Sequence, residues 1–275
     1  MRASLAKVTY GKANKPLSVA RINSIMVPLR MILQEASDRY EFDMPYKNIK
    51  TLKQPKVDVH PFTLEEVWRF INGVREDYKN YYTLRFFTGM RTSEIDGLTW
   101  ENVNFDRQEI KICQALVHRQ MVPPKTQESY RDISMSPWVL EALLEQKKVT
   151  YGRSDYVFCS HNGEPLRYGN VNKRVWHPTL KNLGLKARSA YQTRHTAATL
   201  WLASGESPEW IARQMGHANT EMLFKVYSRY VPNMTRQDGS AFEALVNRSQ
   251  MSIQNTATTD NSKSGANKEV THAND

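Results

Sequence analysis

The sequence predicts a mainly α-helical protein with a small antiparallel β-sheet, an α+β fold. Apolar residues recur at helical spacing in several stretches of the 275-residue chain, first between Val19 and Ala36. The pattern Thr63-Leu-Glu-Glu66 is a capping box of the kind that opens a helix. An alternation of period two, which is typical of strands with one buried face, falls between residues 104 and 135.

The charge of the chain favours a polyanionic partner. Lys and Arg number 38 against 28 Asp and Glu, which gives a net charge of +10. The excess is uneven, because residues 1–57 hold eleven basic residues and four acidic ones. We expect the basic N-terminal part to take a share in binding that partner.

The cysteine content argues against a disulfide framework or a zinc module. Cys113 and Cys159 are the only cysteines, and neither has a paired ligand spacing. His161 follows Cys159 by two residues, but no second pair accompanies them, so we predict no metal site and no cofactor. The sequence shows neither an export signal nor an apolar stretch long enough to cross a membrane. These features predict a cytoplasmic protein with no membrane partner.

The N-terminal segment, residues 1–57, is predicted to be helical and then to become a linker. Pro28 should kink or divide the helix that starts at Val19. Arg21 and Arg30 can lie off its apolar stripe, where they either contact phosphates or form a solvated basic face. Residues 44–61 carry three prolines without a helical period, so we place a domain boundary there, between 57 and 58.

The second domain, residues 58–248, should begin with two helices. The capping box opens one that closes near Gly73, and Tyr81–Phe87 forms a second, buried one. Arg91 then lies at the start of a third helix, where Glu94 is one turn away and can brace its guanidinium group. An ordinary surface ion pair is the alternative for Arg91 and Glu94.

The sheet should follow. Residues 104–108 form a turn between short strands, residues 115–117 extend the β pattern, and residues 129–135 form the returning strand. Between these strands, residues 122–129 are predicted to be a hairpin tip that carries Lys125. Lys125 is either solvated there or reaches into a shared site, since two neighbouring prolines limit its movement.

The remaining elements are assigned from caps and apolar spacing. Ser136 and Pro137 start a helix, residues 156–159 form a short buried strand, and Lys173 and Arg174 lie on a helix over residues 171–183 that can face DNA. Further helices span residues 191–205, 208–215 and 239–248. Another helix, capped by Asn219 or Thr220, lies between the second and third of these. Its apolar face is formed by Met222, Leu223, Val226 and Tyr230, and Tyr227 lies beside that face. Residues 249–275 are almost free of apolar side chains and are predicted to be a disordered tail.

Five motifs in a fixed order resemble those of the tyrosine recombinases, specifically the phage and prophage integrases. They are Arg91 in Thr-Gly-Met-Arg-Thr-Ser-Glu, Lys125 on a hairpin, Tyr191-x-x-Arg194, Gly216-His217 and Tyr227. The resemblance covers roughly residues 60–235, and residues 17–57 look like the last helices of the family's core-binding domain. That domain is usually longer, so we expect N-terminal helices and an arm-binding module to be missing from this chain.

The resemblance implies a role for each motif. Tyr227 matches the nucleophile that forms a 3′-phosphotyrosine link, with Tyr230 as the rival three residues on. Arg91 and Arg194 match the pair that binds the scissile phosphate, and Glu94 matches the bracing acid. Lys125 matches the general acid that protonates the 5′-oxygen, and His217 matches a hydrogen-bonding partner of the phosphate or the nucleophile.

One position departs from the family pattern. The family usually has His where this chain has Tyr191, and a phenol cannot accept a proton at neutral pH as an imidazole does. The identity of the general base is therefore left open by the sequence. We interpret His195, next to Arg194, as a packed histidine with satisfied hydrogen bonds rather than as a site residue.

The resemblance implies a metal-independent site-specific recombinase of prophage type, acting on double-stranded attachment sites. We expect a homo-oligomer, a tetramer, on DNA, with accessory DNA-bending or excision factors as further partners, in a bacterial cytoplasm. The helix around Phe242 is expected to dock on a neighbouring protomer. Two alternatives remain: a truncated integrase remnant that binds DNA without recombining it, and a type IB topoisomerase that relaxes supercoils.

Overall fold

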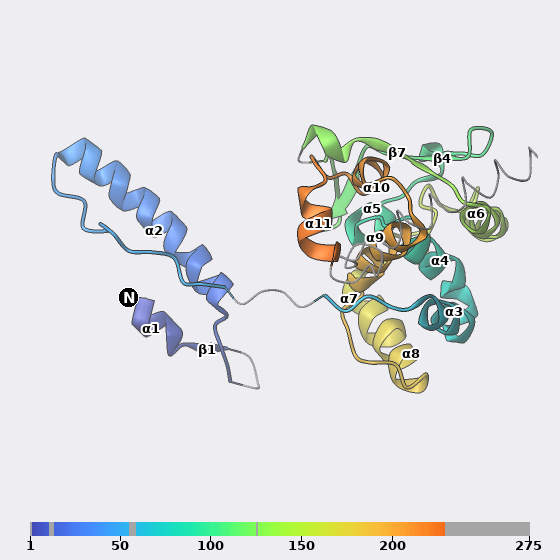
Figure 1. Cartoon of the computed structure of the whole chain (residues 1–275), viewed down its shortest axis with the longest axis horizontal. Coiled ribbons are helices and arrows are strands. Elements are labelled where there is room, and N and C mark those ends of the chain that lie inside the picture. The colour runs from blue at the N-terminus through green and yellow to red at the C-terminus, as the bar shows by residue number, and fades with distance from the viewer. Residues whose placement is uncertain (1, 11–13, 55–58, 125, 229–275) are drawn as a thin grey trace, which may run out of the picture. The chain divides into compact units, whose positions relative to one another are not determined.

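The computed structural model describes residues 2–10, 14–54, 59–124 and 126–228, which form two compact units, Met1–Asp58 and Val59–Asp275 (Figure 1). Lys125, Tyr230, the helix expected over residues 239–248 and the tail over 249–275 lie outside the described residues. Within the described part, no helix has both the length and the apolar character that crossing a membrane requires.

The N-terminal unit is built on one long helix. It contains α1 (Arg2–Ala6), the antiparallel strands β1 (Thr9–Tyr10) and β2 (Lys15–Pro16), and α2 (Val19–Tyr40). The side chain of Asn23 on α2 exchanges two hydrogen bonds with the backbone of Leu52, at 2.8 and 3.0 Å. These bonds hold the extended segment that follows α2 against the helix.

Helix α2 differs from the sequence prediction in two respects. Of the two outcomes predicted for Pro28, a kink or a division, the division does not occur, since α2 runs through Pro28. Pro28 is exposed, so the carbonyl group of Ser24, which loses its helical donor, lies on the solvent side, where water can replace the bond. The apolar stripe is also less buried than expected, since Ile22 and Met26 are buried but Ile32 is 65% exposed.

The second unit has an aromatic core beneath its first helices. Helix α3 (Leu64–Gly73) begins with the predicted capping box of Thr63 and Glu66. The short helix η1 (Glu76–Tyr78) leads into α4 (Lys79–Phe87), which packs against α6 (Pro137–Thr150) and α9 (Gln192–Ser204). The core beneath these helices is a group of edge-to-face and tilted ring contacts among Phe62, Phe70, Tyr82, Phe86 and Trp176.

A three-stranded antiparallel sheet follows the short helices α5 (Thr92–Asp96) and η2 (Trp100–Asn102). Its order is β3 (Val103–Asn104), β4 (Glu109–Ile112), β7 (Arg131–Ser134), and the buried residues Ile110 and Ile133 are paired across β4 and β7. A separate hairpin pairs β5 (Ala115–Val117) with β6 (Gln120–Val122). Residues 109–112 and 131–134 thus form the predicted strand and its returning partner.

The hairpin turn does not lie where the sequence predicted it. His118 and Arg119 form the turn, with positive φ angles of 50° and 68°, which match the right-handed twist of two-residue hairpins. The described residues of the stretch 122–129 instead lead from β6 through η3 (Gln127–Ser129) to β7. The stretch predicted to be a hairpin tip is therefore a connection between two strands rather than the turn itself.

Helices complete the covering of the sheet and the aromatic core. Helix α6 (Pro137–Thr150) starts after Ser136 as predicted, although the Ser136 hydroxyl makes no capping hydrogen bond. Residues 156–159 form two isolated bridges rather than the predicted strand, with Val157 and Phe158 buried. The helix expected over 171–183 begins earlier, as α7 (Tyr168–Val171), and continues through a π-helical segment (Asn172–Trp176) into α8 (His177–Asn182).

The last three described helices form a smaller core of their own. Helices α9 (Gln192–Ser204), α10 (Pro208–Met215) and α11 (Glu221–Tyr227), drawn in gold to orange in Figure 1, pack together, and α10 also packs on β7. Tyr227 is 3% exposed and belongs to the buried face of α11 with Leu223, whereas Met222 is 51% exposed. The sequence had placed Met222 on that face and Tyr227 beside it, which is wrong for both residues.

Candidate active site

Three arginines that are far apart in the sequence meet at the C-terminal end of α10. A helix leaves its last carbonyl groups without intrahelical donors, and they form the negative end of the helix dipole. Three consecutive carbonyl groups at this end each accept a hydrogen bond from a different guanidinium group: Gln214 from Arg131 Nε at 2.7 Å, Met215 from Arg194 Nη2 at 2.6 Å, and Gly216 from Arg91 Nη2 at 2.9 Å. The helix end therefore collects three positive charges at one place.

Gly216 allows this close approach. Its φ angle is +64°, which ends α10 in the left-handed conformation that glycine adopts without strain. A Cβ atom at this position would lie 3.0 Å from Arg131 Nη1 and 3.1 Å from the Glu128 carbonyl oxygen. A side chain here would therefore displace one of the three guanidinium groups.

Glu94 braces two of the three arginines. Its carboxylate accepts hydrogen bonds from Arg91 Nη1 at 2.7 Å and from both Nη atoms of Arg131, at 3.0 and 2.8 Å. It also accepts one from the Arg91 backbone N–H at the start of α5. Burial by itself would raise the pKa of Glu94, but the hydrogen bonds and charges of Arg131 and Arg91 outweigh it and lower the pKa to about 2. Glu94 is therefore ionised at neutral pH and holds the guanidinium groups of Arg91 and Arg131 in fixed orientations.

Arg194 is the most deeply buried of the three arginines, at 2% exposed. Its Nη1 donates to the Gly89 carbonyl oxygen at 2.6 Å, and its Nη2 lies 3.1 Å from His217 Nε2. Burial, aided by the charges of Arg91 and Arg131, lowers its pKa to about 10, so the group stays charged at pH 7. Three of its five N–H groups are engaged by the described residues, which leaves two to bind an anion.

His217 lies against this arginine cluster as a neutral imidazole. Burial, followed by the charges of Arg194, Arg91 and Arg131, lowers its pKa to about 4. Because Arg194 can only donate, Nε2 of His217 must accept and the ring proton resides on Nδ1. Nδ1 is buried and has no partner among the described residues, so this N–H is a donor awaiting an acceptor.

The hydroxyl group of Tyr227 is hydrogen-bonded to His195, at 2.8 Å from Nδ1. Burial raises the pKa of Tyr227 above its usual value, and the charge of Arg194 opposes that rise in part. Burial and then Arg194 lower the pKa of His195 to about 4, so its ring is neutral at pH 7. His195 is packed and hydrogen-bonded, as the sequence interpretation expected, and its partner is the candidate nucleophile.

Tyr191 lies one helical turn before His195 at the start of α9. Its ring meets the His195 ring edge to face, with centroids 5.1 Å apart. The side chain is 42% exposed, so its hydroxyl group can reach a ligand that arrives from solvent. The structure thus connects Tyr191, His195 and Tyr227 in one series of contacts.

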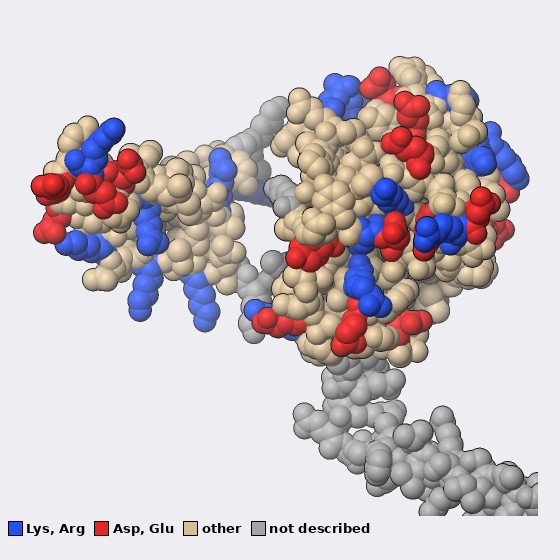
Figure 2. All heavy atoms as spheres, turned by 90° about the horizontal axis from the view of Figure 1, so that it is seen from above, with Lys and Arg blue, Asp and Glu red and all other residues tan. Residues whose placement is uncertain are grey.

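The predicted DNA-contacting residues lie at the surface of the two units. Lys173 and Arg174 are exposed on the π-helical segment, and Arg21 and Arg30 are exposed on α2 of the N-terminal unit. Figure 2 shows Lys and Arg side chains projecting from the N-terminal unit and, on the visible face of the second unit, acidic and basic side chains interspersed. Two of the predicted residues, Lys125 and the rival nucleophile Tyr230, lie outside the described part of the chain.

Sequence reasoning missed Arg131 and His195. Arg131 is two residues before Ile133 and four before Met135, so in a strand its side chain lies on the same, buried face as theirs. The alternation alone therefore indicated a charged side chain that points inward. His195 is four residues after Tyr191 and therefore on the same helical face, which was the available signal for it. Neither signal named the partner, because Glu94 and Tyr227 come from other elements.

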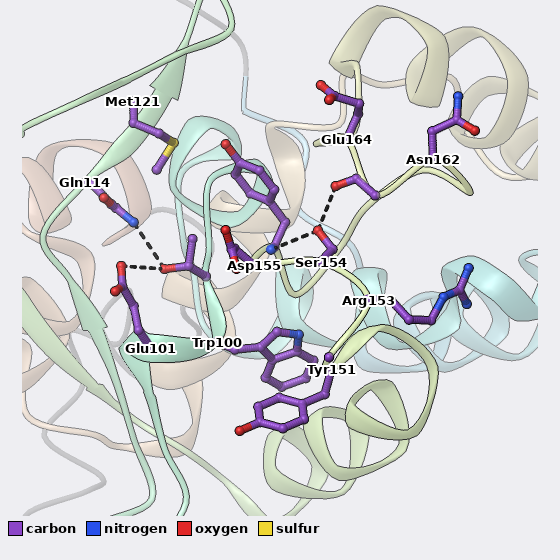
Figure 3. Close-up of a pocket in the computed structure, with 14 residues that line it drawn as sticks. Trp100, Glu101, Gln114, Met121, Tyr151, Arg153, Ser154, Asp155, Asn162 and Glu164 are labelled. Carbon is purple, nitrogen blue, oxygen red and sulfur yellow. Dashed lines mark hydrogen bonds between the residues drawn. The ribbon is translucent and has the colours of Figure 1, made fainter.

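A separate cavity of about 910 Å³ lies between the start of η2 and the loop after α6, and Figure 3 shows the residues that line it. Its charged lining residues are Glu101, Arg153, Asp155 and Glu164, so acidic groups outnumber basic ones. None of the predicted site residues lines this cavity, and its charge is unsuited to a phosphate. Among the residues that the structure describes, no His, Cys, Asp and Glu side chains are grouped as a metal site requires.

Comparison with known proteins identifies the family. A sequence model of the phage integrase family matches residues 60–233. The chain is 29% identical over 271 residues to the putative defective protein IntQ of Escherichia coli K12, covering 88% of this chain and 67% of IntQ. It is 28% identical over 214 residues to the prophage integrase IntR of the same organism, covering 69% of this chain and 52% of IntR. The chain thus spans between about half and two thirds of the length of these relatives.

The fold agrees with that of solved relatives. The integrase of transposon Tn1549, solved in complex with circular intermediate DNA, superposes with a TM-score of 0.66 at 21% identity, covering 84% of this chain and 80% of that one. This likeness and the helices around a small antiparallel sheet confirm the predicted fold class. With its arginines gathered at the end of α10 and a buried tyrosine on the next helix, the chain belongs to the phage integrase family.

Proposed function

We propose that this protein is a site-specific DNA recombinase of the prophage integrase type. In this proposal Tyr227 attacks a phosphodiester, becomes joined to the 3′-phosphate and releases a 5′-hydroxyl end, and the reverse attack rejoins the strands. The observation that supports it most is the convergence of Arg91, Arg131 and Arg194 on consecutive carbonyl groups of α10. The charge of Arg194 also acts on the phenol of Tyr227, which supports a site that includes both residues.

The arginines supply the electrostatic part of the reaction. Arg91 and Arg194 carry N–H groups not engaged by the described residues, and these bind the non-bridging oxygens of the phosphate. Their effect is largest when negative charge grows on the five-coordinate phosphorus, and one such donor is typically worth about 3 to 4 kcal/mol. Arg131 does not bind the phosphate in this scheme, because its guanidinium group already donates hydrogen bonds to Glu94 and to the end of α10.

The remaining groups donate hydrogen bonds or protons. The buried Nδ1–H of His217 gains an acceptor when a phosphate oxygen enters, and the hydroxyl group of Tyr191 donates to another. Lys125 is proposed as the general acid that protonates the leaving 5′-oxygen. Arg194 and Tyr227 are 2% and 3% exposed, so groups that cover them must move aside for the phosphate to meet both.

The N-terminal unit is proposed to take part in gripping the duplex. Arg21 and Arg30 on α2, and Lys173 and Arg174 on the second unit, are exposed and can neutralise backbone phosphates. A tetramer on DNA, accessory bending or excision factors, and a bacterial cytoplasmic location remain parts of the same proposal.

A nicked duplex tests this proposal directly. A nick near the scissile phosphate lets a short 5′-ended fragment escape, so an attacking tyrosine stays covalently bound to the DNA. Nicked duplexes covering the DNA that flanks the coding sequence should give an adduct that survives detergent. An adduct with strand exchange supports the recombinase, and an adduct with relaxation alone supports the topoisomerase. Binding without an adduct supports a DNA-binding remnant and contradicts the proposal.

A further inference from the structure

The hydrogen bond between His195 and Tyr227 has a defined direction. Tyr227 is 3% exposed, and among the described residues its hydroxyl group is hydrogen-bonded to His195 Nδ1. If the imidazole donated, the phenolic hydrogen would be buried without an acceptor, at a cost of about 1 to 3 kcal/mol. The phenol therefore donates, Nδ1 accepts, and the ring hydrogen of His195 is on Nε2.

His195 is held in a state suited to receive a proton. Among the residues that the structure describes, the charged and titratable groups that face the ring are those of Arg194, Tyr191, Tyr227 and His217. The Tyr191 ring contacts the imidazole edge to face, with ring planes 76° apart. No acidic residue among these groups competes for the Nδ1 position.

We propose that His195 is the catalytic base that accepts the proton of Tyr227 as this residue attacks DNA. The inference rests on the proposed recombinase function and names its missing base. As the bond from the Tyr227 oxygen to phosphorus forms, the O–H bond breaks and the proton moves to Nδ1, which leaves His195 as an imidazolium. The bond from phosphorus to the 5′-oxygen breaks, and the proposed general acid Lys125 protonates that oxygen. In the rejoining step each proton returns, so no other reactant is required.

The assignment accounts for the departure at position 191. A histidine there would supply an imidazole, which Tyr191 lacks. His195 is one turn further along α9 and already touches the reacting oxygen. The incoming phosphate adds a negative charge beside His195, which opposes the effect of Arg194 and stabilises the imidazolium that forms.

The test uses the full chain, a nicked duplex on which the wild type forms adduct, and the single-turnover rate of adduct formation. His195→Asn keeps an oxygen near the position of Nδ1 that can accept the phenolic hydrogen, but it cannot take up a proton. We expect adduct formation to slow by about a hundredfold or more, within the range for general bases. His195→Ala should be at least as slow, and retained DNA binding by both variants shows that they fold.

Two rescue experiments separate a base from a positioning residue. Replacing Tyr227 by 2,3,5-trifluorotyrosine makes the phenol more acidic, so this change should restore most of the rate lost in His195→Asn. The same replacement should not rescue Glu94→Gln, whose defect lies in the arginines. A duplex with sulfur in place of the 5′-bridging oxygen needs no general acid, so it should rescue Lys125→Ala but leave His195→Asn slow.

The possible failures are distinguishable. If the wild type forms no adduct on any duplex, the proposed function fails and this inference fails with it. If the wild type reacts and His195→Asn reacts at the same rate, only the inference is overturned. If His195→Asn is slow and trifluorotyrosine restores nothing, His195 positions the phenol without taking its proton, which also overturns the inference.

Discussion

Replacing Glu94 by Gln should destabilise the protein by an amount that the structure lets us work out. Glu94 is 4% exposed and is the shared acceptor for Arg91 and Arg131. Its pKa falls from 4.5 to about 2, and a shift of about 2.5 units corresponds to about 3 kcal/mol of stability at pH 7. The amide introduced by Glu94→Gln would also place N–H groups against the N–H donors of the two arginines. Breaking a buried ion pair typically costs about 3 to 5 kcal/mol.

The pH dependence of this effect has a definite sign. The carboxylate has a lower pKa in the folded state, so its contribution is fully present above about pH 4.5 and is lost as the pH falls towards 2. Acidification therefore lowers the free energy of unfolding of the wild type through protonation of Glu94, and this loss is absent in Glu94→Gln. The difference between them should shrink by about 1 kcal/mol between pH 7 and pH 4.

Urea unfolding of wild type and Glu94→Gln at pH 7 and pH 4 measures both quantities. Glu141→Gln is the matched control, because Glu141 is exposed on α6 and its replacement should change stability by less than about 0.5 kcal/mol. The reasoning is refuted if Glu94→Gln is as stable as the control at pH 7. It is also refuted if the difference from wild type is the same at both pH values.

Three further outcomes are expected. Gly216→Ala should destabilise the protein more than Gly184→Ala does and should also slow adduct formation. Both glycines have positive φ angles, of 64° and 65°, but only a Cβ atom at position 216 would lie against Arg131. Equal losses of stability in urea unfolding would contradict this. Tyr191→Phe should slow adduct formation by about tenfold to a hundredfold if its hydroxyl donates to the phosphate, since such a bond is worth about 1.5 to 3 kcal/mol; an unchanged rate would remove Tyr191 from the reaction. Double replacement of Lys173 and Arg174 by Ala should lower the slope of log affinity against log salt by about 2 in a titration with duplex DNA, and an unchanged slope would place both away from the phosphates.

Local signals predicted the elements that carry the site. The capping box at Thr63, the start of α6 after Ser136 and the end of α10 at Gly216 all depend on neighbouring residues, so the sequence alone located them. The bracing of Arg91 by Glu94 was predictable for the same reason, because the two are three residues apart at the start of one helix.

Contacts between distant elements could not be predicted in this way. Arg131 meets Glu94 across 37 residues, and His195 meets Tyr227 across 32, so no local pattern pairs them. The hairpin turn at His118 and Arg119 was missed because its left-handed residues are not the usual glycine or asparagine. These contacts and this turn depend on the tertiary packing of elements that are distant in the sequence.

The central claim is that Tyr227 itself becomes joined to DNA. The most direct measurement is mass spectrometry of the peptide that remains attached to a nicked duplex after proteolysis, with wild type, Tyr227→Phe and Tyr230→Phe compared. The account predicts a nucleotide attached at Tyr227 in the wild type and in Tyr230→Phe, and no attachment in Tyr227→Phe. An attachment at Tyr230, or an adduct that persists in Tyr227→Phe, would contradict it.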